Sequence, residues 1–229
     1  MMAYNDVRTM IALARDGISV DSWRTQVVLG ARLLASDRRM TQVRIALAVM
    51  RPEGAFLRDD GFLSDLAQAD AATAHDLVYA RYLASVPLAT HIARTVLHPA
   101  RMRGERTISR HALSQALNEH LSTCSAGTRA RSLSAIGSEF ARAGVLRTEK
   151  NGSLEFTGRQ PAALALFYLL RDDLRDRQEA SDQWLSTSSL AAALFLVPPE
   201  TMRVQIDALV AIHRLHRSYY GGEPRILAA

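Results

Sequence analysis

Residues 111–157 read HALSQALNEHLSTCSAGTRARSLSAIGSEFARAGVLRTEKNGSLEFT, and this stretch decides the expected fold. Leu113, Leu117 and Leu121 are spaced four apart, which places them on one side of a helix over 111–121. A small, flexible corner at residues 125–128 follows. The sequence therefore predicts a first helix that ends in a tight turn.

A second helix follows that turn, with Ser125 as its expected N-cap. Leu133, Ile136 and Phe140 form its apolar side, and Gly144 is expected to end it in the left-handed conformation. The opposite side is small and basic, and a face of this kind can approach phosphates more closely than a bulky or acidic one. Its residues are Arg131, Ala135, Ser138 and Arg142.

Two short strands, 145–148 and 154–157, complete the pattern, and they are joined across Asn151-Gly152, a strong hairpin signal. A helix, a turn, a second helix and a two-stranded ribbon make a winged helix-turn-helix. In that motif the second helix enters the DNA major groove, and the hairpin lies along the DNA backbone or the minor groove. Winged-helix units also bind proteins or serve only as structure, because a fold does not fix a function.

The charge distribution favours a polyanionic partner. The 229 residues carry a formal net charge of +5, and residues 94–150 alone hold ten basic against four acidic side chains, a net charge of +6. Lys150, at the expected hairpin tip, is the only lysine. Positive charge concentrated around one unit is typical of a surface that contacts phosphates.

Other classes of protein are disfavoured. The chain has no apolar run of the ~18–20 residues that cross a bilayer, and its start lacks a secretory pattern. Cys124 is the only cysteine, so an intramolecular disulfide and a cysteine zinc site are excluded, and a cytoplasmic protein is expected. There is no glycine-rich phosphate loop, HExxH or GxSxG, and the seven histidines are scattered. We therefore expect no membrane contact, no metal, no cofactor and no enzymatic activity.

The rest of the chain predicts a mostly α fold with three domains: a helical domain at 1–100, the winged helix-turn-helix at 101–159 and a second winged-helix-like unit at 160–229. A helix from residue 86 is expected to stop at Pro99. In the last domain Ser186 or Thr187 is the expected cap of a helix through Phe195. A further helix over 200–213 and a hairpin of 214–219 with 224–227 follow. This second helix carries mixed charge, which favours packing or partner binding over DNA contact.

The segment ARMRGERT at 100–107 lies before the first unit, and it is basic and without periodicity. It reads either as a solvated loop or as an arm that contacts phosphates through Arg101, Arg103 and Arg106. The expected DNA surface combines this arm with the second helix and the hairpin tip. Besides the arm, its residues are Ser125, Thr128, Arg129, Arg131, Ser138, Arg142, Lys150 and Asn151.

Three segments carry a resemblance to a known family. Residues 15–52 contain a tryptophan-bearing helix, a Leu-Leu step and an arginine-rich helix. Residues 132–156 contain a helix, a glycine and a hairpin, and residues 194–226 contain a closing helix and a hairpin that ends in Arg-Ile. Together they resemble the BrxA family, small accessory proteins of BREX phage-defence islands. The resemblance implies a mostly helical protein with winged-helix character that binds double-stranded DNA without catalysis. It supplies no residue roles.

The leading hypothesis is a non-enzymatic accessory protein that binds double-stranded DNA with weak sequence preference. Weak preference is expected because the helix after Ser125 contains no Asn or Gln, the side chains that commonly read adenine. One alternative is a transcription regulator whose helical N-terminal half senses a ligand or dimerises. A second is a protein–protein adaptor, and RNA binding by the helical N-terminal half is a third. Other defence-system subunits and a second copy of the chain are further candidate partners.

Overall fold

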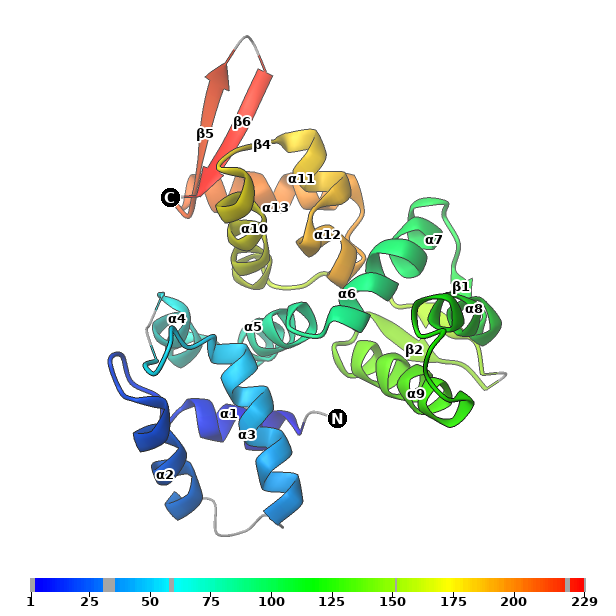
Figure 1. The fold of residues 1–229 in the computed structure, drawn as a ribbon. Helices are drawn as coiled ribbons and strands as arrows, with labels where there is room; N and C mark the ends of the chain where they lie inside the picture. The colour runs from blue at the N-terminus through cyan, green and yellow to red at the C-terminus, as the bar shows by residue number, and fades with distance from the viewer. Residues whose placement is uncertain (1–2, 31–35, 58–59, 151, 221–222, 229) are drawn as a thin grey trace. The chain divides into compact units, whose positions relative to one another are not determined.

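The computed structural model describes residues 3–30, 36–57, 60–150, 152–220 and 223–228. The chain forms two compact units, 1–85 and 86–229, and Figure 1 labels their elements. The described residues are mostly helical, with two small three-stranded sheets, so the expected mostly α class is confirmed. Among the described helices, none has both the length and the apolar character that a bilayer crossing requires. The division into compact units does not test the expected domains at 1–100, 101–159 and 160–229, which stay predictions.

The first unit is a set of helices packed around buried aromatic side chains. Trp23 is fully buried, and its indole Nε1 donates a hydrogen bond to the carbonyl oxygen of Met10 at 3.0 Å. This bond satisfies the polar atom of the largest side chain in the core, which would otherwise be costly to bury. The helices are α1 (Tyr4–Ile11), α2 (Val20–Gly30), α3 (Ser36–Met50), α4 (Phe62–Gln68) and α5 (Ala71–Ala84).

An ion pair between a buried arginine and a partly exposed aspartate ties α5 to the segment before α4. Arg81 is 1% exposed, and its guanidinium lies 2.5 Å from the Asp60 carboxylate and 3.3 Å from the carbonyl oxygen of Val49. The same guanidinium lies over the Phe62 ring, 4.0 Å from its centroid. The charge of Arg81 is therefore compensated on several sides.

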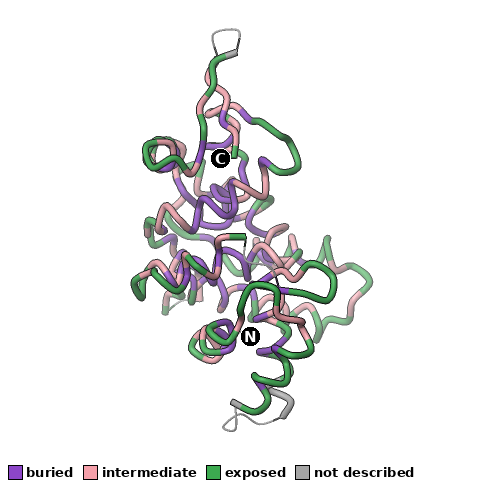
Figure 2. Tube along the Cα trace, turned by 90° about the vertical axis from the view of Figure 1, so that its left-hand side faces the viewer, coloured by how far each residue is buried: buried purple, intermediate pink, exposed green. Residues whose placement is uncertain are grey.

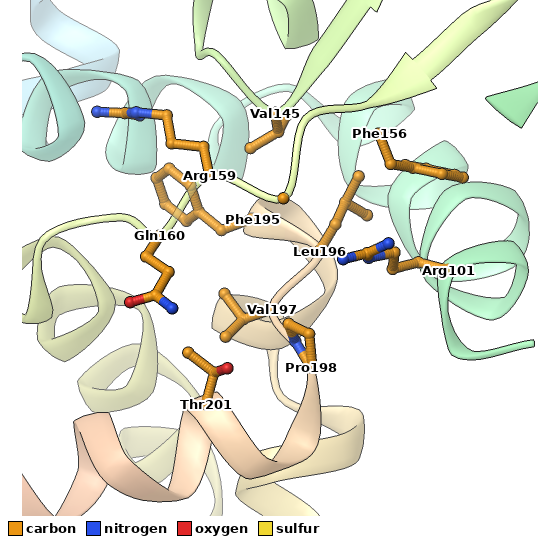
Figure 3. Close-up of a pocket in the computed structure, with 11 residues that line it drawn as sticks. Arg101, Val145, Phe156, Arg159, Gln160, Phe195, Leu196, Val197, Pro198 and Thr201 are labelled. Atoms are coloured by element: carbon orange, nitrogen blue, oxygen red, sulfur yellow. The ribbon is translucent and has the colours of Figure 1, made fainter. Parts of the chain in front are cut away.

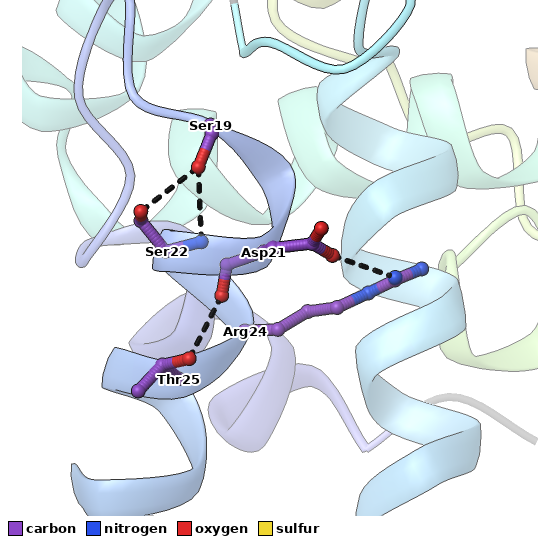
Figure 4. Close-up of polar contacts among 5 residues, drawn as sticks. All are labelled: Ser19, Asp21, Ser22, Arg24 and Thr25. Atoms are coloured by element: carbon purple, nitrogen blue, oxygen red, sulfur yellow. Dashed lines mark hydrogen bonds and ion pairs between the residues drawn. The ribbon is translucent and has the colours of Figure 1, made fainter.

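The start of α2 shows how short polar residues set helix ends in this chain. The Ser19 hydroxyl accepts a hydrogen bond from the backbone N–H of Ser22 at 3.1 Å, and so satisfies one of the free amides of the first turn (Figure 4). Asp21, in that first turn, pairs with Arg24 at 3.3 Å.

The second unit contains two copies of one arrangement, and the first copy spans the stretch on which the expected fold rests. Ser109 and Ser125 cap its two helices, each accepting from the backbone N–H three residues ahead at 3.2 Å. Both apolar stripes point inward as predicted, although Leu121 and Leu133 are only half-buried. Its elements are β1 (Thr107–Ile108), α8 (Arg110–His120), α9 (Ala126–Arg142), β2 (Leu146–Thr148) and β3 (Leu154–Phe156).

The sheet of this first copy has the order β1-β3-β2, with both pairs antiparallel. Thr107 lies opposite Glu155 on one side of β3, and Arg147 lies opposite Glu155 on the other. The β2–β3 hairpin was expected, but β1 was not. A strand of two residues is too short to show an alternating pattern in sequence.

The second copy repeats the order with strands β4-β6-β5. Ser186 or Thr187 was expected to cap a helix of this copy, and that expectation is wrong. Ser186 is fully buried inside α11 and donates to the carbonyl oxygen of Gln183, while Ser189, in extended backbone, accepts from the N–H of Ala192 at 3.1 Å. Residues 221–222 of its hairpin lie outside the described residues. The elements are β4 (Ala180–Ser181), α11 (Asp182–Ser188), α12 (Leu190–Phe195), α13 (Pro199–Ala211), β5 (Leu215–Tyr220) and β6 (Glu223–Ala228).

The two copies end their last helix, α9 in the first and α13 in the second, in the same way. In the first, the N–H of Gly144 bonds to the carbonyl of Ala141 and that of Val145 to Phe140. In the second, the N–H of His213 bonds to Val210 and that of Arg214 to Leu209. This pair of bonds needs a left-handed residue, and φ is +76° at Gly144 and +57° at His213. The two copies are therefore structural repeats.

A second expectation about this unit is also wrong. The helix that begins at Pro87 does not stop at Pro99. It runs as α6 (Pro87–Ile92), a π-helical turn η1 (Ala93–Leu97) and α7 (His98–Met102). The π turn restarts the helix, so Pro99 stands in the first turn of α7, where a missing N–H costs nothing.

The helix α10 (Ala163–Arg177) follows the first repeat in the chain and packs against α12 and α13 of the second. Residues 165–170 and 191–197 are all buried (Figure 2). Asp173 on α10 accepts a hydrogen bond from the N–H of Leu190 at 2.6 Å and lies 3.6 Å from Arg94 on η1. Burial raises the pKa of Asp173 to about 6, although the Leu190 bond and Arg94 act in the opposite direction.

The helix end at His213 predicts a stabilising substitution. His213→Gly should raise the free energy of unfolding by about 1 kcal/mol, because glycine adopts the left-handed conformation without the steric cost that histidine bears. Urea unfolding at neutral pH measures this change. The matched control is His213→Ala, which removes the ring but keeps the strained backbone. A glycine variant no more stable than the alanine variant would contradict the prediction.

Asp173 predicts a pH dependence. Its pKa is raised in the folded state, so its protonated form is favoured there. The stability that this form contributes is full below the unfolded pKa of 3.8 and is lost as the pH rises through about 6. The side chain introduced in the variant Asp173→Asn cannot titrate. Between pH 4 and pH 7 the wild type should therefore lose about 1–3 kcal/mol of unfolding free energy relative to the variant. Urea unfolding across this range tests it, and parallel pH curves would show that the pKa is not raised.

Candidate nucleic-acid interface

The outward face of α9 carries the cations expected of a groove-binding helix. Ile136 and Phe140 are buried against the rest of the repeat, whereas Arg131 and Arg142 are exposed and Ser138 is half-buried. The helical period of 3.6 residues places these polar side chains opposite the apolar stripe. The structure therefore brings Arg131, Ser138 and Arg142 onto one helix, as predicted.

The start of α9 is held by local hydrogen bonds. Ser125 and Thr128 are both exposed, and the Ser125 hydroxyl accepts the Thr128 N–H and lies 3.0 Å from the Thr128 hydroxyl. Arg129 folds back, and its guanidinium donates to the carbonyl oxygen of Cys124. Arg131 also reaches back, with Nε 3.3 Å from the carbonyl oxygen of Gly127. In this structure Arg129 closes the turn and does not project outward, whereas Arg131 stays at the surface.

The hairpin places one lysine at its tip. Lys150 is exposed, and the turn is closed by the bond from the N–H of Gly152 to the carbonyl of Glu149 at 2.9 Å. Asn151, a predicted contact residue, lies outside the described residues.

The two acids of the hairpin, Glu149 and Glu155, are both paired with one arginine. Arg147 lies 2.5 Å from Glu155 and 3.2 Å from Glu149, and the hydrogen bond to Glu155 is the main cause that raises the pKa of Arg147. On α9 itself, Glu139 is buried. These three acids are therefore either paired with Arg147 or buried.

Arg110, which the sequence reasoning did not select, belongs to the same surface. It is the first residue of α8, and a side chain at Gly152 would come within 3.9 Å of its guanidinium arm. With Ser134, Ser138 and Thr148 it also lines a cavity of about 250 Å³ between α8, α9 and the hairpin. Its position directly after the capping Ser109 is a sequence signal that could have identified it.

The predicted arm is not one element. Arg101 lies on α7, half-buried, and lines a cavity near the α12–α13 turn (Figure 3). Arg103 is paired with Glu105 at 2.7 Å. Arg106 is exposed, and its carbonyl oxygen accepts the N–H of Phe156, which ties this segment to the sheet. The three arginines therefore have three different environments.

The corresponding surface of the second repeat has a different character. Arg217 on β5 is paired with Asp182 at 3.0 Å and Asp207 at 2.6 Å, so its charge is compensated. Val204 on α13 and Tyr219 on β5 are 64% and 72% exposed. This surface is less cationic and more apolar than that of the first repeat. Within the described part of the chain, no three His, Cys, Asp or Glu side chains are placed to hold a metal ion.

Comparison with known proteins identifies a fold but no family. No family model matches the chain, and no curated protein matches it. Two solved structures are similar to it: a magnesium-bound SspB with a TM-score of 0.61 and a second SspB structure with a TM-score of 0.60. Each is 11% identical to this chain. The matches cover the whole of this chain and 80% and 81% of the SspB chains.

Proposed function

We propose that residues 107–156 form a winged helix-turn-helix that binds double-stranded DNA, with α9 in the major groove and the β2–β3 hairpin as the wing. The observation that carries this proposal is the outward face of α9, where Arg131 and Arg142 are exposed while the nearby acids are buried or paired. A helix preceded by a capped turn and followed by a hairpin is the arrangement that such DNA-binding units use.

The binding is proposed to depend mainly on phosphates. Arginine and lysine release counterions when they neutralise phosphates, and serine can donate a hydrogen bond to the backbone. The α9 helix contains neither Asn nor Gln, so it lacks the side chains that commonly read adenine. We propose weak sequence preference for this reason.

The biological role proposed is that of a non-enzymatic accessory protein of a bacterial phage-defence system, acting in the cytoplasm. The resemblance of residues 15–52, 132–156 and 194–226 to the BrxA family supports it. The likeness to SspB concerns the fold alone, at 11% identity.

A protein-binding adaptor is the second candidate, and one observation favours it. The second repeat exposes three large apolar side chains: Val204 on α13, Ile212 directly after that helix and Tyr219 on β5. Large apolar side chains that stay exposed at a surface can mark contact with another protein. The two functions are compatible if the first repeat binds DNA and the second binds a partner.

The DNA surface is tested by the double substitution Arg131→Ala with Arg142→Ala. Removing one arginine–phosphate pair should lower the slope of log K against log salt by about one unit, so the double variant should show a slope about two units lower. Fluorescence anisotropy with a duplex at several salt concentrations measures the slope. The control is Arg175→Ala with Arg203→Ala, which removes two exposed arginines of α10 and α13 and the same charge. Equal decreases in both double variants would remove α9 from the interface.

Weak sequence preference is tested separately. A set of random duplexes and the best duplex from a selection experiment should differ in affinity by much less than about a thousandfold, the lower range for specific DNA-binding proteins. Gel-shift titrations at one fixed salt concentration measure the ratio. Discrimination above a thousandfold, with a palindromic footprint, would favour the transcription regulator.

A further inference from the structure

A cavity lies where the two repeats of the second unit meet. Its volume is about 190 Å³, which is several times the ~30 Å³ that a water molecule takes up in the liquid. Figure 3 shows Arg101 reaching from α7 toward Leu196, with Val197 and Pro198 supplied by the α12–α13 turn and Thr201 by the start of α13. The remaining lining comes from the base of the first hairpin and the segment that leads to α10.

The cavity has cationic and neutral polar walls. Arg101, Arg159, Gln160 and Thr201 line it, and none of its described lining residues is acidic. Arginine and amide nitrogens donate hydrogen bonds, and the threonine hydroxyl can also donate one. A ligand held by this set of groups must be an acceptor, and an anion is favoured over a neutral acceptor.

Arg101 is the cation available to such a ligand. It is half-buried, and no described residue forms a hydrogen bond or ion pair with its guanidinium. The acid nearest in sequence, Glu105, is engaged by Arg103 at 2.7 Å. Gly158 lies beside the group: a Cβ added there would be 3.8 Å from the Arg101 guanidinium, an ordinary contact distance.

Arg159, which also lines the cavity, is held in place by contacts with the end of α9. Its guanidinium donates to the carbonyl oxygen of Ala143 at 2.9 Å, and its stem lies against Gly144, where an added Cβ would be 2.9 Å away. This arginine therefore joins the end of α9 to the cavity.

We propose that this cavity binds a phosphate group, with Arg101 as its principal ligand and Thr201 and Gln160 as further donors. The planar fork of arginine suits the oxygens of a phosphate, which it can bind through two parallel hydrogen bonds. The position of Thr201 in the first turn of α13 adds the positive end of that helix to the site. The phosphate comes either from the DNA backbone or from a free ligand such as a nucleotide. The site does not rest on DNA binding by α9.

The first experiment uses inorganic phosphate and the full chain. Thermal unfolding is followed in increasing sodium phosphate and in sodium chloride of the same ionic strength, and calorimetric titration gives the affinity. Wild type should show a saturable rise in Tm with phosphate. Arg101→Gln should weaken phosphate binding about tenfold, the loss of one charge-assisted pair. Arg101→Lys keeps the charge without the fork and should fall between them.

The matched control is Arg103→Gln, which removes the same charge two residues away, from a side chain paired with Glu105 outside the cavity. It should bind phosphate as wild type does. Thr201→Val leaves Arg101 in place and should weaken phosphate binding by about threefold, so the site can be tested even if Arg101→Gln does not fold. A wild type without a saturable phosphate response, or equal losses in Arg101→Gln and Arg103→Gln, would overturn the proposal.

The second experiment identifies the source of the phosphate. If it belongs to DNA, Arg101→Gln should lower duplex affinity and reduce the salt slope by about one unit, and inorganic phosphate should compete. If it belongs to a free ligand, Arg101→Gln should lose the phosphate response and keep the duplex affinity of wild type. Both results support the site. The two proposals can fail separately. If the Arg131 and Arg142 double variant binds DNA as wild type does, the DNA surface on α9 is wrong, but the phosphate response that depends on Arg101 is still expected.

Discussion

Pairing between the first and last strands of each repeat is the constraint on which the second unit depends. Thr107 and Ile108 pair with Glu155 and Leu154, so a strand of two residues joins points almost fifty residues apart. Ala180 and Ser181 pair with Ile226 and Arg225 in the same way. Closing a loop of this length costs entropy that the helices within it must offset by burying apolar side chains. The sheet thereby fixes where each helix pair begins and where its hairpin emerges.

The same constraint shows why the two surfaces can differ while the folds agree. The strand order and the helix-end hydrogen bonds use backbone atoms, which tolerate many side chains. The first repeat carries Arg131 and Arg142 on its second helix, and the second carries Glu200 and Asp207 on the corresponding helix. In the second repeat, Asp207 compensates Arg217 on the neighbouring strand. One backbone arrangement thus presents a cationic surface in one copy and a mixed, partly apolar surface in the other.

The sequence predicted those features that depend on neighbouring residues. The Ser125 cap, the apolar stripe of α9, the Gly144 helix end and the hairpin are all local, and the structure contains them. It could not predict β1 and β4, whose two-residue strands gain their partners only from distant segments. Pro99 was expected to end its helix. The π turn before it lets the helix continue, and such a turn leaves no periodic signal in the sequence.

The candidate site shows the same division. Arg131, Ser138 and Arg142 follow from the helical period alone. The positions of Arg129 and Arg101 do not follow from it. The Arg129 guanidinium donates to the carbonyl oxygen of Cys124, and Arg101 lines a cavity. Arg110 reaches the candidate site from α8, and Arg159 reaches the cavity from the segment before α10, through packing that residue spacing does not reveal.

Of the 28 basic side chains, a single one is lysine, and the fold places it at the exposed tip of the first hairpin. Reagents and enzymes that acylate side-chain amines therefore have one target in this chain, whereas arginines are inert to them. Acetylation of Lys150 would remove one charge from the wing and leave every guanidinium of α9 unaltered. The chain thus has a single side-chain amine that can be modified in this way, and it lies in the hairpin that follows the helix proposed to enter the groove.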